Sequence, residues 1–221
     1  MKQTKAQIRE AKEWLAKGHS PFEVLDRVYK VSALKGRRNF IGQPGTNHEL
    51  EAFTAGRFGE ILGASTVIVG DSPDAKFAFP NGEQLSAEIV SADRENRKIA
   101  EEIPPALSEF HPDYLSASKA LVALETACRK KLSKNYSAPN PALIIYLNGF
   151  WIQKEEHRKT IIRGTLIASK KFSSIFIHDS YGITRAWKNG RPAYKRWWFE
   201  ELSRKLSLRQ EDRFFSTVFS E

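Results

Sequence analysis

Apolar residues recur three or four positions apart in several long stretches of the chain, and this spacing predicts amphipathic helices. The stretches cover residues 4–17, 21–35, 46–62 and 115–136. Pro21 stands at the first position of the second stretch, where a helix tolerates its missing N–H. The last stretch has the clearest apolar stripe, which consists of Ala117, Leu121, Leu124, Cys128 and Leu132.

Short apolar runs of strand length alternate with helical patterns in the second half of the chain. Residues 142–147 (ALIIYL) and 174–178 are predicted strands, with a predicted helix over residues 155–171 between them. Residues 65–69 are also rich in β-forming side chains. Strands that alternate with helices require crossover connections, so the chain is predicted to be an α/β protein with a mixed central sheet.

Residues 77–90 have the alternation of a half-buried hairpin around Pro80-Asn81-Gly82. A three-residue loop with Gly82 in the left-handed conformation would place Asp74 directly opposite Glu88. Phe and Leu side chains would then share one face of the hairpin, and charged side chains the other. The alternative is a two-residue Asn-Gly turn, which would put the two carboxylates on opposite faces.

The charge of the chain is unevenly distributed along its 221 residues. Residues 1–46 contain 10 Lys and Arg against 4 Asp and Glu, residues 47–150 contain 10 against 14, and residues 151–221 contain 15 against 8. We expect an N-terminal basic helical extension over 1–46, a core over 47–180 and a basic, aromatic-rich C-terminal extension over 181–221. Basic ends around an acidic centre suit a protein that holds a polyanion and a divalent cation, although many ordinary surfaces share this balance.

The remaining composition narrows the class of protein. The single cysteine, Cys128, excludes a disulfide framework and a thiolate zinc site and fits a reducing compartment. No apolar run reaches the roughly 18 residues that a membrane span needs, so we expect a cytoplasmic protein without a membrane partner. No phosphate-binding loop or nucleophile elbow is present, and the histidines lack metal-ligand spacing. His178-Asp179 follows a predicted strand, where active-site residues of open sheets gather, but a packed or solvent-facing histidine is the commoner outcome there.

Two carboxylates directly opposite each other on paired strands repel, and a cation between them removes that penalty. Magnesium prefers oxygen ligands and takes one or two carboxylates while keeping several waters. Asp74 and Glu88 are therefore candidate ligands for Mg²⁺ or Mn²⁺. The alternative is a solvated face on which Lys76 neutralises both acids.

The order of these elements resembles the core of the PD-(D/E)xK, or restriction-endonuclease-like, nuclease superfamily. A helix with glutamates is followed by a strand, by Pro73-Asp74 leading into a second strand, and by Ala87-Glu88-Ile89-Val90 in a third. The long helix and the strand over 142–147 come next. The resemblance covers residues 47–150 and implies an α/β/α core in which Asp74 and Glu88 bind the metal and act in catalysis, with a helix glutamate, Glu51 or Glu60, assisting.

The chain departs from this family where the motif lysine should stand, because Val90 occupies that position. Lys76 is the first candidate to replace it as a catalytic residue, and Lys130 or Lys134 could reach in from the long helix. With an equivalent lysine, the resemblance implies a magnesium-dependent endonuclease, which is a hydrolase that acts on DNA. A homodimer is a possible assembly for such an enzyme. Without one, it implies an inactive nuclease-fold module that binds nucleic acid or a protein partner.

Several basic side chains are candidates for contacts with nucleic-acid phosphates. Two of them lie in the Lys35-Gly36-Arg37-Arg38 stretch, and others in residues 185–198, where aromatic residues are interleaved. The candidate phosphate-binding residues are Arg37, Arg38, Lys130, Lys134, Arg191, Lys195 and Arg196.

Overall fold

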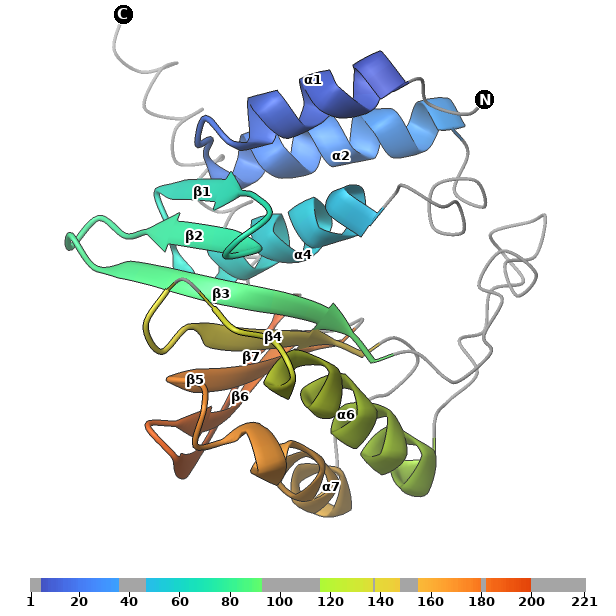
Figure 1. Cartoon of the computed structure of the whole chain (residues 1–221), viewed down its shortest axis with the longest axis vertical. Coiled ribbons are helices and arrows are strands. Elements are labelled where there is room, and N and C mark those ends of the chain that lie inside the picture. The colour runs from blue at the N-terminus through green and yellow to red at the C-terminus, as the bar shows by residue number, and fades with distance from the viewer. Residues whose placement is uncertain are drawn as a thin grey trace, which may run out of the picture.

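The structure is a computed structural model that describes residues 5–35, 47–92, 116–136, 138–147, 155–179 and 182–199. One seven-stranded sheet runs through these residues, and its strands lie side by side in chain order (Figure 1). The strands are β1 (Thr66–Val69), β2 (Ala75–Ala78), β3 (Gln84–Ser91), β4 (Ala142–Tyr146), β5 (Ser174–His178), β6 (Gly182–Lys188) and β7 (Arg191–Trp198).

The sheet is mixed, as the sequence predicts. Strands β1, β2 and β3 are antiparallel, β3, β4 and β5 are parallel, and β5, β6 and β7 are again antiparallel. Two helices make the crossovers between the parallel strands. These are α6 (Ala117–Leu132) and α7 (Glu155–Thr165), which continues into the short 3₁₀ helix η2 (Leu166–Ala168).

Helices cover both faces of the sheet and bury a separate apolar core on each. On one face lie α1 (Lys5–Leu15), α2 (Pro21–Lys35) and α4 (Asn47–Leu62). There Phe58 packs with ring centroids 4.9 Å from Phe77 and 4.8 Å from Phe176. On the other face, α6 and α7 pack on alternate residues of β3, β4 and β5. The molecule is therefore an α/β protein with helices on both sides of a mixed sheet.

The N-terminal helices belong to this fold. Leu15, Val24 and Val28 are buried in the same core as Phe58. Two glycines of α4 allow the close approach, because a Cβ on Gly56 would lie 2.9 Å from Leu25 Cγ and one on Gly59 would lie 2.7 Å from Val67 Cγ2. Residues 5–35 therefore pack on α4 and β1 as part of the helical layer on this face of the sheet.

Residues 182–198 were expected as part of a basic extension packed on the core, and they form β6 and β7, the last two strands of the sheet. Their turn is Asn189-Gly190, with φ of 50° and 71° at its two residues. Asn-Gly between alternating side chains is the strongest short-range signal of a hairpin. The many basic and aromatic residues obscured that signal in the sequence.

The register predicted for the β2–β3 hairpin is confirmed. Ala75 pairs with Ala87, and Phe77 pairs with Leu85. Gly82 has a φ of 83°, and Phe79 N–H donates to Glu83 O at 2.9 Å, so the loop is Pro80-Asn81-Gly82. This register carries both carboxylates to one end of the hairpin.

Candidate active site

Asp74 and Glu88 lie together on the face of the sheet that α6 covers. Asp74 directly precedes β2, and Glu88 lies in β3 one step beyond the Ala75–Ala87 pair. The Asp74 carboxylate is held to β3 because its Oδ2 accepts a hydrogen bond of 2.7 Å from Ile89 N–H. The Glu88 side chain is only 5% exposed. The hairpin register therefore produces a nearly buried pair of acids.

The amine of Lys131 lies between these two carboxylates. Its Nζ is 2.5 Å from Asp74 Oδ2 and 2.9 Å from Glu88 Oε2. The Lys131 side chain is itself only 5% exposed. A basic group from helix α6 thus contacts both acids.

Helix α6 brings Lys131 to the acids because Lys131 belongs to its buried stripe. That stripe begins at Ala120 and repeats every three or four residues through Leu124, Ala127 and Cys128 to Lys131. Lys130 and Lys134, the lysines expected to reach the acids from this helix, are neighbours of Lys131, which was not among the expected residues. The signal was available, because Lys131 is the one lysine on the apolar stripe of that predicted helix, where a charge requires a partner.

Val90, at the usual position of the motif lysine, faces the same helix. It follows Glu88 by two residues on β3, so both side chains point to the same side of the sheet. Val90 is 5% exposed and packs in the core that α6 buries. Val90 packs the strand β3 against α6, and Lys131 of the same helix contacts the two acids.

One ammonium contacts two carboxylates, and this sharing affects the pKa values of Lys131 and Glu88. Burial disfavours the charge on Lys131, but hydrogen bonds and charges from Asp74 and Glu88 outweigh it, so the pKa of Lys131 is raised. Burial also raises the pKa of Glu88, and Lys131 offsets only part of that effect. The cluster therefore holds a charged lysine and a surplus of acid.

Tyr136 closes the cluster beyond the end of α6. Its hydroxyl donates a hydrogen bond to the backbone carbonyl of Lys131. Burial, together with the nearby charges of Glu88 and Asp74, raises the pKa of the tyrosine, so its hydroxyl stays protonated. The contact fixes the turn of helix from which Lys131 projects.

Of the two glutamates considered on the helix α4, the structure brings Glu51 to the cluster. Burial and the charge of Asp74 raise the pKa of Glu51, the charge of Lys131 lowers it, and the net result is a pKa of about 7. Glu60 lies nine residues later, which in an α-helix is about 13.5 Å away and on the opposite side. There it pairs with Arg57 at 2.9 Å. The residue placed for an assisting role is therefore Glu51 and not the expected Glu60.

The other lysines considered near the acids lie elsewhere. Lys76 is exposed and makes no hydrogen bond or ion pair with any described residue. Lys130 and Lys134 are exposed at the end of α6. Within the described chain, Lys131 is the lysine that contacts both carboxylates.

Among the described residues, no group of three or more His, Cys, Asp or Glu side chains is arranged to hold a metal ion. Lys131 contacts one oxygen of each acid, Asp74 Oδ2 and Glu88 Oε2, and the two carboxylates also lie within hydrogen-bonding reach of each other. Two neighbouring carboxylates are the kind of oxygen ligand that Mg²⁺ accepts and that softer metals do not favour.

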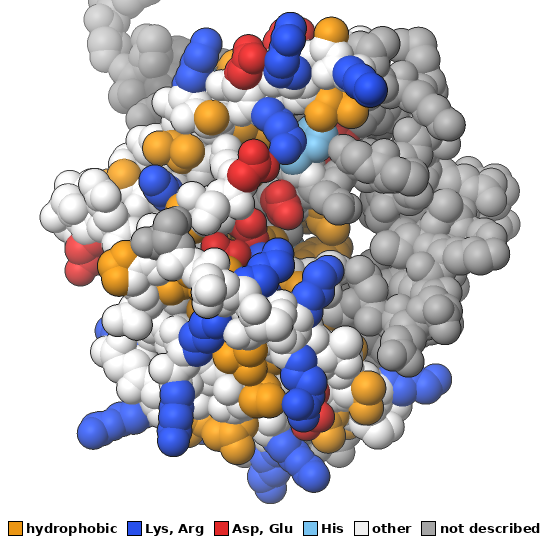
Figure 2. Space-filling model, viewed as in Figure 1, with side chains coloured by type: hydrophobic (Ala, Val, Ile, Leu, Met, Phe, Trp, Pro, Cys, Tyr) orange, Lys and Arg blue, Asp and Glu red, His pale blue; other side chains and the backbone are white. Residues whose placement is uncertain are grey.

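The candidate phosphate-binding residues are scattered. Arg37 and Arg38 lie outside the described residues, whereas Arg191 and Lys195 are exposed on β7. Arg196 is not available for phosphate, because its side chain is 7% exposed and its Nη1 pairs with Asp179 Oδ2 at 2.9 Å. Figure 2 shows acidic side chains gathered in the middle of one face, with Lys and Arg side chains on either side of them.

His178 is a packed residue. It is 1% exposed, its ring lies among Phe53, Tyr146 and Phe199, and burial lowers its pKa to about 3. It therefore stays neutral over the ordinary pH range.

No protein-family model matches this sequence, and no curated protein or solved structure is significantly similar to it. None of the described helices is long and apolar enough to cross a membrane. Evidence for the function therefore comes from the residues of the site.

Proposed function

We propose that the protein is a magnesium-dependent nuclease of the PD-(D/E)xK type whose motif lysine is supplied by Lys131 of α6. The observation that carries this proposal is the convergence of Asp74, Glu88 and Lys131, with Lys131 Nζ 2.5 Å and 2.9 Å from the two carboxylates. The three residues come from three elements, so neither strand pairing nor helix formation alone requires them to meet.

The order of elements supports the restriction-endonuclease-like fold within this α/β protein. Helix α4 is followed by the antiparallel strands β1, β2 and β3, then by α6 and by β4 parallel to β3. The two acids lie on β3 and at the start of β2, where the family layout puts them. In this proposal, strands β5 to β7 and helices α1 and α2 extend that core on its two sides.

Each side chain has a distinct role in the proposed reaction. Asp74 and Glu88 would hold Mg²⁺ or Mn²⁺, and Glu51 would assist them. The ion would supply polarisation of the phosphoryl group and activation of water. Lys131 would orient the attacking water and offset negative charge that develops on the phosphate.

DNA is the proposed substrate because the flanking charge is basic. The chain has a formal net charge of +9, and exposed Lys130, Lys134, Arg191 and Lys195 are candidate phosphate contacts. Phosphate contacts make binding strongly dependent on salt. An affinity for DNA that did not fall with salt would contradict these contacts.

The direct test is cleavage of supercoiled plasmid with Mg²⁺ or Mn²⁺. Asp74→Asn, Glu88→Gln and Lys131→Met should each lower the rate by at least about 100-fold, as expected for loss of a metal ligand or proton-transfer partner. The matched control is Lys119→Met, which removes an exposed lysine near the other end of α6 and should keep the wild-type rate. Cleavage that survived the Asp74 and Glu88 substitutions would overturn the assignment of the site.

A nucleic-acid-binding module without cleavage is the second candidate, and the contact of Lys131 with both acids favours it. An ammonium in that position already neutralises part of the negative charge without a metal ion. This candidate is correct if the wild-type protein binds DNA in a salt-dependent manner and leaves the plasmid intact with either metal.

A further inference from the structure

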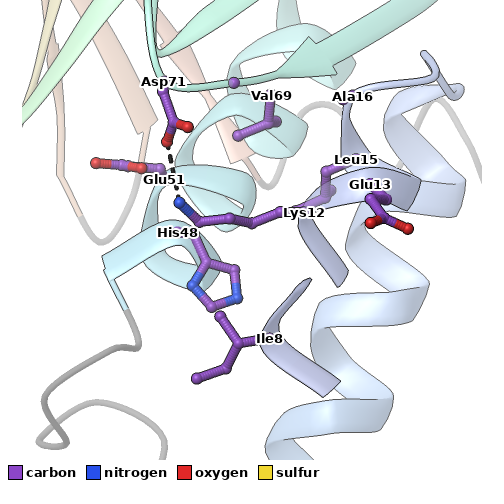
Figure 3. A pocket seen from close by; sticks show the side chains of 10 residues that line it. Ile8, Lys12, Glu13, Leu15, Ala16, His48, Glu51, Val69 and Asp71 are labelled. Carbon is purple, nitrogen blue, oxygen red and sulfur yellow. Dashed lines mark hydrogen bonds and ion pairs between the residues drawn. The ribbon is translucent and has the colours of Figure 1, made fainter. Parts of the chain in front are cut away.

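A cavity of about 630 Å³ opens beside the carboxylates, between α1, the start of α4 and the loop after β1 (Figure 3). Glu51 joins the two places, because it lines this cavity and also interacts electrostatically with Asp74 and Lys131. A ligand in the cavity would therefore lie next to the proposed reaction centre. Sites that take small ligands have volumes of roughly 300–1,000 Å³.

The inner wall of the cavity is apolar and aliphatic. Ile8 and Leu15 reach it from α1, and Val69 reaches it from the end of β1. Such a wall suits the flat face of an unstacked base, which has little affinity for water on that side. The imidazole of His48 also lines the cavity and offers a ring on which a base can stack.

The rim of the cavity is acidic. Glu13, Glu51 and Asp71 line it, with Lys12 as the opposing positive charge. Three carboxylates repel a phosphate, so the group that enters is not the backbone of a nucleic acid. Carboxylates accept hydrogen bonds from the exocyclic amines of bases, as Asp and Glu do with cytosine N4.

The rim can open for a ligand at little cost. Lys12 Nζ lies 3.0 Å from Asp71 Oδ1, and the two side chains are 49% and 89% exposed. Figure 3 shows the Lys12 side chain reaching across the cavity toward Asp71, with Glu51 beside them. Ion pairs this exposed contribute little stability, so the amine is free to move to a phosphate outside the mouth.

We propose that this cavity binds one unpaired base of the nucleic-acid strand next to the scissile phosphate, with a preference for a base that carries an exocyclic amine. The proposal rests on the nuclease function above. It names the substrate class as single-stranded, frayed or flipped nucleic acid, because a base must leave its stack to enter a pocket. Helix α1, which lies outside the region of family resemblance, builds one wall.

Ala16→Trp tests the proposal by filling the cavity. Ala16 is exposed at the end of α1 and lines the cavity, so a larger side chain can enter without disturbing the core. Ala6→Trp is the matched control, because Ala6 is exposed on the same helix and does not line the cavity. Folding of both variants is checked by circular dichroism.

Binding is measured without cleavage, in EDTA and then in Ca²⁺, on single-stranded oligonucleotides with 2-aminopurine at successive positions. At one position the wild type should raise the fluorescence of 2-aminopurine, because a base that enters the cavity leaves its stacked neighbours in the strand. Ala16→Trp should abolish that rise and weaken binding about tenfold, a loss of ~1.4 kcal/mol. Ala6→Trp should match the wild type, and a paired blunt duplex should distinguish none of the three proteins.

A second variant tests the base preference independently of the filled cavity. The wild type should bind cytosine more tightly than thymine at the responsive position, and Asp71→Ala should reduce that preference. Asp71 is exposed, so the substitution leaves the fold intact.

The outcomes separate this inference from the proposed function. A fluorescence rise in a protein that cuts nothing would retain the base pocket and overturn the nuclease. The base pocket would be overturned, and the nuclease retained, if the protein cut DNA without raising the fluorescence at any position. The same conclusion would follow if Ala16→Trp and Ala6→Trp gave equal fluorescence and equal binding.

Discussion

Two buried clusters in this protein join a cation to carboxylate, and they differ in their balance of charge. In the first, Arg196 of β7 meets Asp179 at the end of β5 through two contacts, Nη1–Oδ2 at 2.9 Å and Nη2–Oδ1 at 3.0 Å. One cation meets one anion, Gly182 N–H also donates to Asp179 Oδ1, and Arg196 Nη1 also donates to Thr184 Oγ1. In the second, the single amine of Lys131 meets both Asp74 and Glu88.

This difference separates a structural ion pair from a candidate functional site. The Arg196–Asp179 pair is neutral and planar, and it fastens the last strand to the middle of the sheet. The Lys131 cluster has two carboxylates for one ammonium, and Glu51 links it to the cavity beside α1. Surplus buried charge is unfavourable unless an ion or substrate compensates it. Substituting the members of each cluster tests this contrast.

The largest effect on stability is expected for Arg196→Met. It leaves Asp179, whose side chain is 0% exposed, buried without its cation. Breaking a buried pair in this way costs about 3–5 kcal/mol of unfolding free energy. Urea denaturation measures the loss, and Lys195→Met, at the exposed neighbouring residue, should cost less than about 1 kcal/mol. Equal losses in the two variants would mean that the Arg196–Asp179 pair contributes no special stability.

A smaller loss is expected for Lys131→Met. It leaves two acids without their amine, but water reaches Asp74, whose side chain is 13% exposed, and Glu88 can take up a proton. We expect a cost of about 2–3 kcal/mol at pH 8, shrinking as the pH falls toward 5. Denaturation at the two pH values gives the difference, with Lys119→Met as the control. A cost independent of pH would show that Glu88 does not take the proton.

Glu51→Gln should stabilise the protein above neutral pH. The pKa of Glu51 in the folded protein is about 7, above its ordinary value of 4.5, so between these pH values the folded state holds a proton that the unfolded state has lost. Stability of the wild type therefore falls as the pH rises from 4.5 to 7, and the amide removes that fall. We expect a gain of about 1–3 kcal/mol at pH 8 and none at pH 4.5. If the unfolding free energy rose by the same amount at both pH values, the titration of Glu51 would not be the cause of the gain.

The smallest effect on stability is expected for Glu88→Gln. It removes one of two carboxylates that share one ammonium, so the unfolding free energy should change by less than about 1 kcal/mol while cleavage is lost. The corresponding Asp179→Asn, at the balanced cluster, should cost about 3–5 kcal/mol. Denaturation of the two variants side by side measures the contrast. If Glu88→Gln lowered the unfolding free energy as much as Asp179→Asn does, both clusters would be structural ion pairs.

The sequence by itself determined most of the elements and the placement of the two acids, although it did not reveal the β6–β7 hairpin. The spacing of apolar residues predicted the helix Pro21–Lys35 and the strand Ser174–His178 with the bounds that the structure shows. It also predicted a helix within residues 115–136. The hairpin register followed from the turn Pro80-Asn81-Gly82 and from side-chain alternation, which are local properties. Asp74 and Glu88 could therefore be paired without any knowledge of tertiary contacts.

Only the tertiary structure decided which other side chains reach that pair. A helix presents residues in every direction, so whether Lys130, Lys131 or Lys134 meets the acids depends on how α6 docks on β3 and β4. The same reasoning applies to Glu51 and Glu60, which lie on opposite sides of α4. Arg196 was expected at a phosphate, and the packing of β7 against β6 buries it with Asp179. Contacts between elements far apart in the chain depend on packing, which local patterns of residues do not encode.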